Sequence, residues 1–195
     1  MFEYVAEFES QIAEFFGAPY AVATDSCTHA IELCLRHTGF DNITIPTRTY
    51  ISVPMTCAKL GLNWNWKEEE WSDYYHLGNT TIIDAAVLWG KNTYLSNTFM
   101  CLSFQFRKHL NLGRGGAILL QNKSDYDTLK KMSYDGRDLS RPWAEQDIDT
   151  IGYHYYMTPE VAKNGIELLN ERKKIPGKKW SHRDYPDLTQ MSVFK

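Results

Sequence analysis

Apolar residues recur along the first sixteen positions at the spacing of an amphipathic helix. Val5, Phe8, Ile12 and Phe16 fall on one side of such a helix, and glutamates lie mostly between them. This pattern predicts a helix with one buried face. Gly17 follows directly and predicts where the helix ends.

Shorter apolar runs and further helical patterns alternate along the rest of the chain. Strands are expected at 20–24, 43–46, 62–66, 80–83, 99–104 and 117–120, and helices at 30–36, 51–60, 126–134 and 159–170. Polar segments at 67–79 and 137–150 predict loops. Alternating strands and helices are typical of the α/β class, so we expect a mostly parallel sheet flanked by helices.

Composition narrows the classes of protein to which the chain can belong. Its 195 residues suffice for one sizeable domain. The net charge of −3 gives no basic field, so we expect neither nucleic-acid binding nor attraction to an anionic membrane. No apolar run is long enough to span a bilayer, and the acidic N-terminus is unlike a secretory signal. Four scattered cysteines without a CxxC pair favour a reduced, cytoplasmic protein with no cysteine-based metal site.

The stretch at 101–121 carries the most distinctive chemistry in the sequence. Lys108 lies between two apolar runs, just before the glycines at 113, 115 and 116. A partly desolvated lysine loses its proton more easily and can attack a carbonyl to form a Schiff base. Glycines allow a ligand to approach the backbone closely. A strand–loop–strand hairpin with a solvated lysine explains this stretch, taken alone, about equally well.

Two other positions are candidates for ligand binding. Asp25, Ser26 and Thr28 lie where a strand turns into a helix, and the free N–H groups at such a helix start bind phosphate readily. Most capped helices nevertheless bind nothing. Asp84 ends an apolar strand, at the edge where open α/β sheets place their ligands.

Together these residues resemble a known enzyme family. Ser103, Phe104, Lys108 and the three glycines match in spacing the lysine motif of the DegT/StrS family of pyridoxal-phosphate (PLP) sugar aminotransferases. Arg114 stands where the family usually has glutamate. The resemblance covers about 8–169 and implies the large domain of the aspartate-aminotransferase-like fold, fold type I.

The resemblance implies a role for each matching residue. Lys108 would hold PLP as a Schiff base and move protons, and Asp84 would pair with the pyridine nitrogen. Tyr50 would stack on the cofactor ring. The phosphate would be held by Ser26, Thr28 and Ser103.

Four further positions depart from the family pattern. Cys27 replaces a glycine of the phosphate turn, where we still expect contact with the cofactor. Val87 replaces a glutamine that lies near the ring, so a polar partner is lost. His154 and Tyr156 replace an asparagine and an arginine that reach the neighbouring subunit's site. His154 can still donate to a phosphate, whereas Tyr156 cannot supply a positive charge.

The function that the resemblance implies is transfer of an amino group from an amino acid such as glutamate to a nucleotide-linked keto sugar. A homodimer with shared active sites is expected. Residues 1–170 would form the PLP-binding large domain, without the family's usual small C-terminal domain, and 171–195 a basic and mixed tail. We expect this tail to be partly disordered or docked on a partner, and the activity to be slow.

Other functions stay open at this point. A PLP-dependent sugar dehydratase would use the same cofactor and could keep Lys108. A non-catalytic relic could bind PLP, a nucleotide sugar or a protein partner; Val87 and Tyr156 favour this alternative, and Lys108 and Asp84 oppose it. A third alternative is a structural subunit that pairs with a longer homologue.

Overall fold

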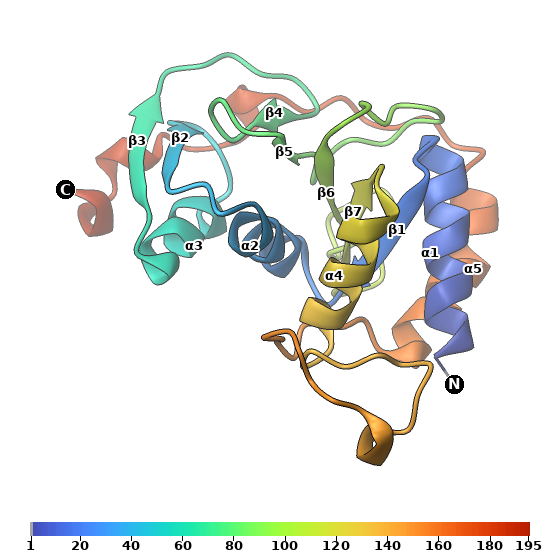
Figure 1. Cartoon of the computed structure of the whole chain (residues 1–195). Helices are drawn as coiled ribbons and strands as arrows, with labels where there is room; N and C mark the ends of the chain where they lie inside the picture. The colour runs from blue at the N-terminus through green and yellow to red at the C-terminus, as the bar shows by residue number, and fades with distance from the viewer. Residues whose placement is uncertain (1) are drawn as a thin grey trace.

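The computed structural model describes residues 2–195 and arranges helices on both sides of a central sheet (Figure 1). The helices are α1 (Glu3–Phe16), α2 (Cys27–Thr38), α3 (Ser52–Leu60), α4 (Lys123–Ser133) and α5 (Pro159–Arg172). The strands are β1 (Tyr20–Thr24), β2 (Asn42–Pro46), β3 (Asn63–Lys67), β4 (Tyr75–His76), β5 (Ile82–Asp84), β6 (Phe99–Ser103) and β7 (Gly116–Leu120). Short 3-10 turns occupy Trp143–Glu145, His182–Asp184, Leu188–Gln190 and Ser192–Phe194.

The ends of the helices follow from local sequence. Gly17 stops α1 in the left-handed conformation, with φ of 77°, a region that glycine enters without steric cost. Ser26 begins α2 because its side chain accepts a hydrogen bond from the N–H of His29. Thr158 caps α5 in the same way, and Pro159 fills its first turn. The predicted helices are therefore confirmed.

The main sheet has the strand order β1-β7-β6-β5-β4. Strands β1, β6 and β5 run in one direction, and β7 and β4 run in the opposite direction. The α/β class with flanking helices is confirmed, but the sheet is mixed rather than mostly parallel. No helix separates β6 from β7, so the chain returns directly and the two strands pair antiparallel.

Two smaller differences from the expected strands concern the edge strand β4 of the main sheet and a second, separate sheet. Strand β4 forms within the polar segment 67–79 that predicts a loop. Its pairing with β5 brings Tyr75 opposite Asp84. Strands β2 and β3 pair parallel to each other in a separate two-stranded sheet.

Alternate side chains of each strand enter two different apolar layers. Met100 and Leu102 of β6 pack with Phe8 of α1, on the face that α1 and α5 cover. Cys101, between them, faces the layer that contains Leu33 of α2. This period-2 alternation between two buried faces explains why the strand sequences are apolar throughout. In Figure 1, α1 and α5 lie side by side on one face of the sheet, and α2 and α4 lie on the other.

The four cysteines are free and buried. None of the helices in the described part of the chain could span a bilayer.

The C-terminal tail packs on its own chain at several points. Leu188 is 1% exposed, and its N–H donates to the carbonyl of Thr47 at 2.8 Å. Further along, Phe194 packs edge-on against Trp64 and Trp66 of β3. The structure therefore differs from the expectation of a partly disordered tail, because Leu188 and Phe194 pack beside β2 and β3, and docking of the tail on a partner stays a prediction. In Figure 1 the tail crosses above β4 and β5 on its way to β3.

Replacing Leu188 should loosen this tail before it unfolds the rest of the domain. Leu188→Ala removes a fully buried side chain, which costs about 2–5 kcal/mol. We expect faster trypsin cleavage at the lysines of the tail while the circular dichroism of the helices changes little. Val193→Ala is the matched control, since Val193 is 62% exposed. Equal cleavage rates for the two variants would contradict this account of the tail.

Candidate active site

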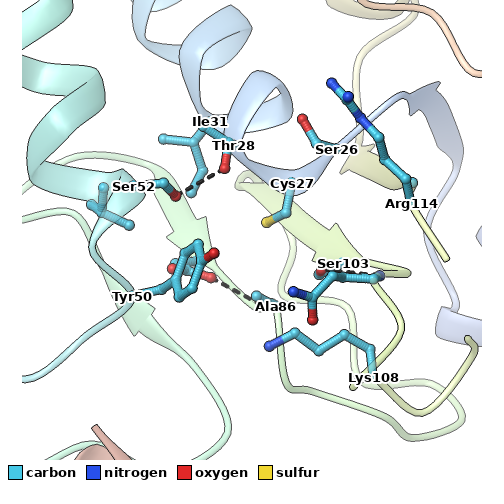
Figure 2. A pocket seen from close by; sticks show the side chains of 14 residues that line it. Ser26, Cys27, Thr28, Ile31, Tyr50, Ser52, Ala86, Ser103, Lys108 and Arg114 are labelled. Carbon is cyan, nitrogen blue, oxygen red and sulfur yellow. Dashed lines mark hydrogen bonds between the residues drawn. The ribbon is translucent and has the colours of Figure 1, made fainter. Parts of the chain in front are cut away.

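A cleft opens where the carboxyl ends of β5 and β6 meet the N-terminal ends of α2 and α3 (Figure 2). Asp84 ends β5, and Ser103 ends β6. Cys27 and Ser52 are the first residues of α2 and α3. Two helix N-termini, each with a partial positive charge, therefore border the same cavity.

Seven of the nine residues proposed from the sequence line this cleft. They are Ser26, Cys27, Thr28, Tyr50, Asp84, Ser103 and Lys108. The structure therefore brings together residues that are up to 82 positions apart, counted from Ser26 to Lys108. Their roles toward a cofactor remain proposals.

The N-terminal end of α2 forms a tight polar turn. The Ser26 hydroxyl is used as the helix cap, and the Thr28 hydroxyl donates to the Ser52 hydroxyl at 2.8 Å. Gly116 of β7 lies so close that a Cβ there would come within 2.4 Å of the carbonyl carbon of Ser26. Only glycine fits at this position without a shift of the turn, so the glycine cluster holds the turn against the sheet.

The buried carboxylate of Asp84 is held by two hydrogen bonds. The Tyr75 hydroxyl donates to Oδ2 at 2.6 Å, and the Ala86 N–H donates to Oδ1 at 3.0 Å. Burial raises the pKa of Asp84, and these two hydrogen bonds and the charge of Lys108 oppose that rise. Tyr75 also contacts the Thr49 hydroxyl. Sequence reasoning missed Tyr75 because it lies in the segment that predicts a loop.

Lys108 extends its amine into the cleft from the loop after β6 (Figure 2). The backbone N–H of Lys108 donates to the carbonyl of Gln105 at 2.8 Å, and this bond fixes the turn that carries the lysine. Burial lowers the pKa of the Lys108 amine, and the charge of Arg107 adds to this, while Asp84 and Cys27 act in the opposite direction. The amine therefore loses its proton more readily than an exposed lysine, as a nucleophile toward a carbonyl requires.

Cys27 lies at the floor of the cleft as a thiol rather than a thiolate. Its Sγ donates to the carbonyl of Cys101 at 3.4 Å. Burial raises the pKa of Cys27 well above its ordinary value, and the charge of Asp84 adds to this effect. A thiol in that state is a poor nucleophile, so Lys108 is a better candidate than Cys27 for a nucleophile in this cleft.

The sequence matches the DegT/DnrJ/EryC1/StrS aminotransferase family over residues 1–64 and 86–179. The chain belongs to this family. No curated protein is significantly similar to the sequence.

Solved structures share the fold at low sequence identity. AtS13 from Actinomadura melliaura is 21% identical with a TM-score of 0.78, over 88% of this chain and 60% of its own. The sugar aminotransferase CalS13 from Micromonospora echinospora is 14% identical with a TM-score of 0.75, over 88% and 61%. Spr1654 from Streptococcus pneumoniae in its PLP form is 16% identical with a TM-score of 0.72, over 88% and 60%. This chain therefore spans about three fifths of the length of these structures.

Val87, which also departs from the family pattern, does not line the cleft. Its side chain is 3% exposed and packs in the apolar layer that contains α2. Ala86 lines the cleft instead. The turn after β5 thus directs the apolar side chain of Val87 into the core, and its contact with the cofactor stays a prediction.

His154 also lies outside the cleft of its own chain. Its Nδ1 is 2.9 Å from Oδ2 of Asp135, and its side chain is 70% exposed. Tyr156 packs edge-on against Tyr134 and lies beside the ring of Phe2. The contribution of His154 to a neighbouring subunit's site stays a prediction.

Arg114, which stands where the family usually has glutamate, is paired with Asp25. Its Nη2 donates to Oδ2 of Asp25 at 2.6 Å, and Nδ1 of His29 lies 2.6 Å from the other carboxylate oxygen. Burial alone would raise the pKa of Asp25, but the hydrogen bonds from His29 and Ser26 and the charge of Arg114 outweigh it and lower the pKa. Sequence reasoning named Asp25 only as part of the turn and missed its partner His29.

Replacing Asp84 should stabilise the cofactor-free protein at neutral pH. The pKa of Asp84 is raised in the folded state, so the unfolded chain releases this proton at a lower pH than the folded protein does. The free energy of unfolding therefore falls as pH rises from the ordinary aspartate pKa to the pKa of Asp84 in the folded protein. Asp84→Asn removes this loss, and we expect a free energy of unfolding higher by about 1–2 kcal/mol at pH 7. The gain should fade towards pH 4.

Urea unfolding at pH 4 and pH 7 measures this difference. Asp127→Asn is the control, because Asp127 lies on the surface of α4 with a side chain that is 54% exposed. Lower stability of Asp84→Asn than of the unsubstituted protein at pH 7 would show that the carboxylate stabilises the fold, contrary to the prediction.

Proposed function

We propose that this chain binds PLP at Lys108 and transfers an amino group between an amino acid and a keto sugar. The observation that carries the proposal is that an amine, a carboxylate and two helix N-termini share one cleft. A lysine of lowered pKa and a buried carboxylate share a cavity whose other end is bordered by two helix N-termini. Membership of the aminotransferase family supports the reaction class.

The polar groups that line the cleft fit a phosphorylated pyridine aldehyde. The turn at Ser26 offers backbone N–H groups and a helix dipole to a phosphate. The close approach at Gly116 leaves this turn tight and open to the cavity. Asp84 can accept a hydrogen bond from a pyridine nitrogen, and Lys108 offers an amine to an aldehyde. PLP, when bound, supplies an aldehyde that condenses with amines and a ring that takes up electrons.

Lys108 and Asp84 would divide the proton chemistry between them. The Lys108 amine, neutral more often than an exposed lysine, would hold the cofactor and then move a proton at the substrate carbon. Asp84 would accept the hydrogen bond of a protonated ring nitrogen, and Tyr75 keeps that carboxylate in place. A positive ring nitrogen would also stabilise the Asp84 charge, whose burial is otherwise unfavourable.

Tyr50 and the phosphate end would orient the cofactor. The Tyr50 side chain is 52% exposed and lines the cleft, so its ring has an open face for stacking. Ser26, Thr28 and Ser103 would contact the phosphate. Arg114 lines the same cavity, with its guanidinium paired to Asp25.

The substrates remain part of the proposal. The solved sugar aminotransferase CalS13 shares this fold, which favours a keto sugar as acceptor, and we propose that the sugar is nucleotide-linked with glutamate as donor. We also propose a homodimer in which His154 serves the neighbouring site. The loss of charge at Tyr156 removes one charge-assisted contact of about 1.5–3 kcal/mol, so turnover should be slow by about one to two powers of ten.

An amino-donor half-reaction tests the proposed function. Protein loaded with PLP should show a visible absorption band, and glutamate should bleach that band slowly as the amino group is transferred. A keto sugar should then restore the band. Lys108→Ala should keep its fold and lose the band, whereas Lys91→Ala, at an exposed lysine, should behave as the unsubstituted protein.

The outcomes separate the alternatives. A band that persists in Lys108→Ala would mean that another lysine holds the cofactor. A band at Lys108 that no amino donor bleaches would favour the non-catalytic relic. Loss of water from a sugar without net amino transfer would favour the dehydratase.

A further inference from the structure

Two oppositely charged side chains meet beside the turn that begins α2. Asp25 directly precedes the helix cap Ser26, and its side chain is 22% exposed. Arg114 comes from the loop before β7, and its side chain lines the cleft (Figure 2). The Nη2 of Arg114 donates to Oδ2 of Asp25 at 2.6 Å, and its Nε donates to the Asp25 carbonyl at 3.3 Å. Two hydrogen bonds thus join the arginine to the residue in front of the helix.

The fold also holds Asp25 from other directions. Its backbone N–H donates to the carbonyl of Tyr155 at 2.8 Å. Its Oδ1 accepts a hydrogen bond from the Ser26 hydroxyl at 3.0 Å and lies 2.6 Å from Nδ1 of His29. The ring of His29 stacks in turn on Tyr155, with ring centres 3.6 Å apart. The carboxylate of Asp25 is therefore fixed beside the turn, and its charge acts on any ligand that approaches.

The loop that carries Arg114 is fixed as well. The Phe104 N–H donates to the Gly115 carbonyl at 2.9 Å, and the Phe106 N–H donates to the Gly113 carbonyl at 3.1 Å. These bonds lie on both sides of Arg114 and tie its loop to the segment that follows β6. The meeting of Arg114 with Asp25 is therefore a built feature of the fold, although the arginine side chain is 68% exposed.

Without Arg114 the charges at this turn would not suit an anion. Burial opposes ionisation of Asp25, but the hydrogen bonds from His29 and Ser26 and the charge of Arg114 lower its pKa, so the carboxylate is ionised at neutral pH. A helix N-terminus carries only about half a unit of positive charge, which a full carboxylate charge outweighs. Arg114 keeps its proton at any physiological pH, so it supplies a permanent counter-charge and makes the turn positive again.

The other basic group of the cleft cannot take over this task. Among residues 2–195, Lys108 is the one further basic side chain in the cleft lining. Its amine must be neutral to react with a carbonyl, so its charge is not available to hold an anion. Arg114 is therefore the basic residue that can balance Asp25 while a ligand is bound.

We propose that Arg114 is a positioning residue for the cofactor phosphate, and that it acts by neutralising Asp25 so that the turn before α2 attracts an anion. This inference rests on the proposed function, because that function supplies the phosphate. Arg114 acts through Asp25 and not through contact with the reacting atoms. The requirement for Arg114 should therefore disappear when residue 25 carries no charge.

Titration of the cofactor-free protein with PLP and with pyridoxal, the same aldehyde without the phosphate, tests the proposal. The visible band reports the binding of both. Arg114→Gln should raise the Kd of PLP about tenfold, the loss expected for a partly exposed charge-assisted interaction, and leave the Kd of pyridoxal unchanged. Arg183→Gln is the matched control and should change neither Kd, since Arg183 is an exposed arginine near the carboxylate of Glu70 and outside the cleft lining.

A double-mutant cycle with Asp25→Asn isolates the neutralisation of the carboxylate. In the Asp25→Asn background, Arg114→Gln should change the Kd of PLP by less than about twofold, because no charge is left to balance. Circular dichroism of each variant checks that the helices are intact. The pyridoxal titration is a second check, since a distorted cleft would weaken the binding of both aldehydes.

Three results would overturn this proposal. One is an equal Kd of PLP in Arg114→Gln and Arg183→Gln. Another is equal weakening of PLP and pyridoxal by Arg114→Gln, which would indicate a general structural role. The third is an undiminished tenfold effect of Arg114→Gln in the Asp25→Asn background, which would mean that Arg114 acts independently of Asp25.

Failure of the proposed function would look different. Neither aldehyde would then give a visible band that depends on Lys108. Calorimetry with inorganic phosphate would still measure anion binding at the turn before α2. Weaker phosphate binding in Arg114→Gln than in Arg183→Gln would support the role of Arg114, and equal binding or none in the unsubstituted protein would contradict it.

Discussion

The site depends on the hydrogen bonds that hold the buried carboxylate of Asp84. A charge at that depth is unfavourable unless polar groups surround it, and the fold supplies Tyr75, the Ala86 N–H and the nearby Lys108. Each partner comes from a different part of the chain, so β4, β5 and the loop after β6 must all be in place. The same low polarity that raises the pKa of Asp84 lowers that of Lys108. One desolvated cavity thus holds both a carboxylate that can accept a hydrogen bond and an amine that loses its proton readily.

The second constraint is the close approach of β7 to the turn before α2. Gly116 leaves no room for a side chain beside Ser26, so the helix N-terminus lies directly against the sheet that carries Asp84 and Ser103. This contact places the helix N-terminus of the cleft at a fixed position relative to the Asp84 carboxylate. A ligand that is anionic at one end and basic at the other is therefore matched by the fold itself.

Much of the fold could be predicted because its signals are local. The helix α1 follows from apolar spacing and Gly17, and the buried strands follow from apolar runs bounded by polar turns. Strand β4 could not be predicted, since two residues in a polar segment give no periodicity. The direction of β7 depends on a chain reversal rather than on its sequence, which is why a mostly parallel sheet was expected.

The site shows the same division between local and long-range information. Lys108, Asp84 and Ser26 could be named because Lys108 lies in a loop between two apolar runs, Asp84 ends a strand and Ser26 caps a helix. Tyr75 could not, because its role depends on pairing between β4 and β5.

The tail was also beyond sequence reasoning, since Trp180 and Tyr185 matter only through the segments on which they dock. Position in the fold, rather than residue type, determines these roles.

The most direct measurement of the central claim is chemical fixation of the cofactor. Protein incubated with PLP is reduced with borohydride, digested and analysed by mass spectrometry. The account predicts that the added mass is found on the peptide containing Lys108, at about one equivalent per chain, and that Lys91 remains unmodified under the same conditions. Labelling spread over exposed lysines, with Lys108 unmodified, would contradict it.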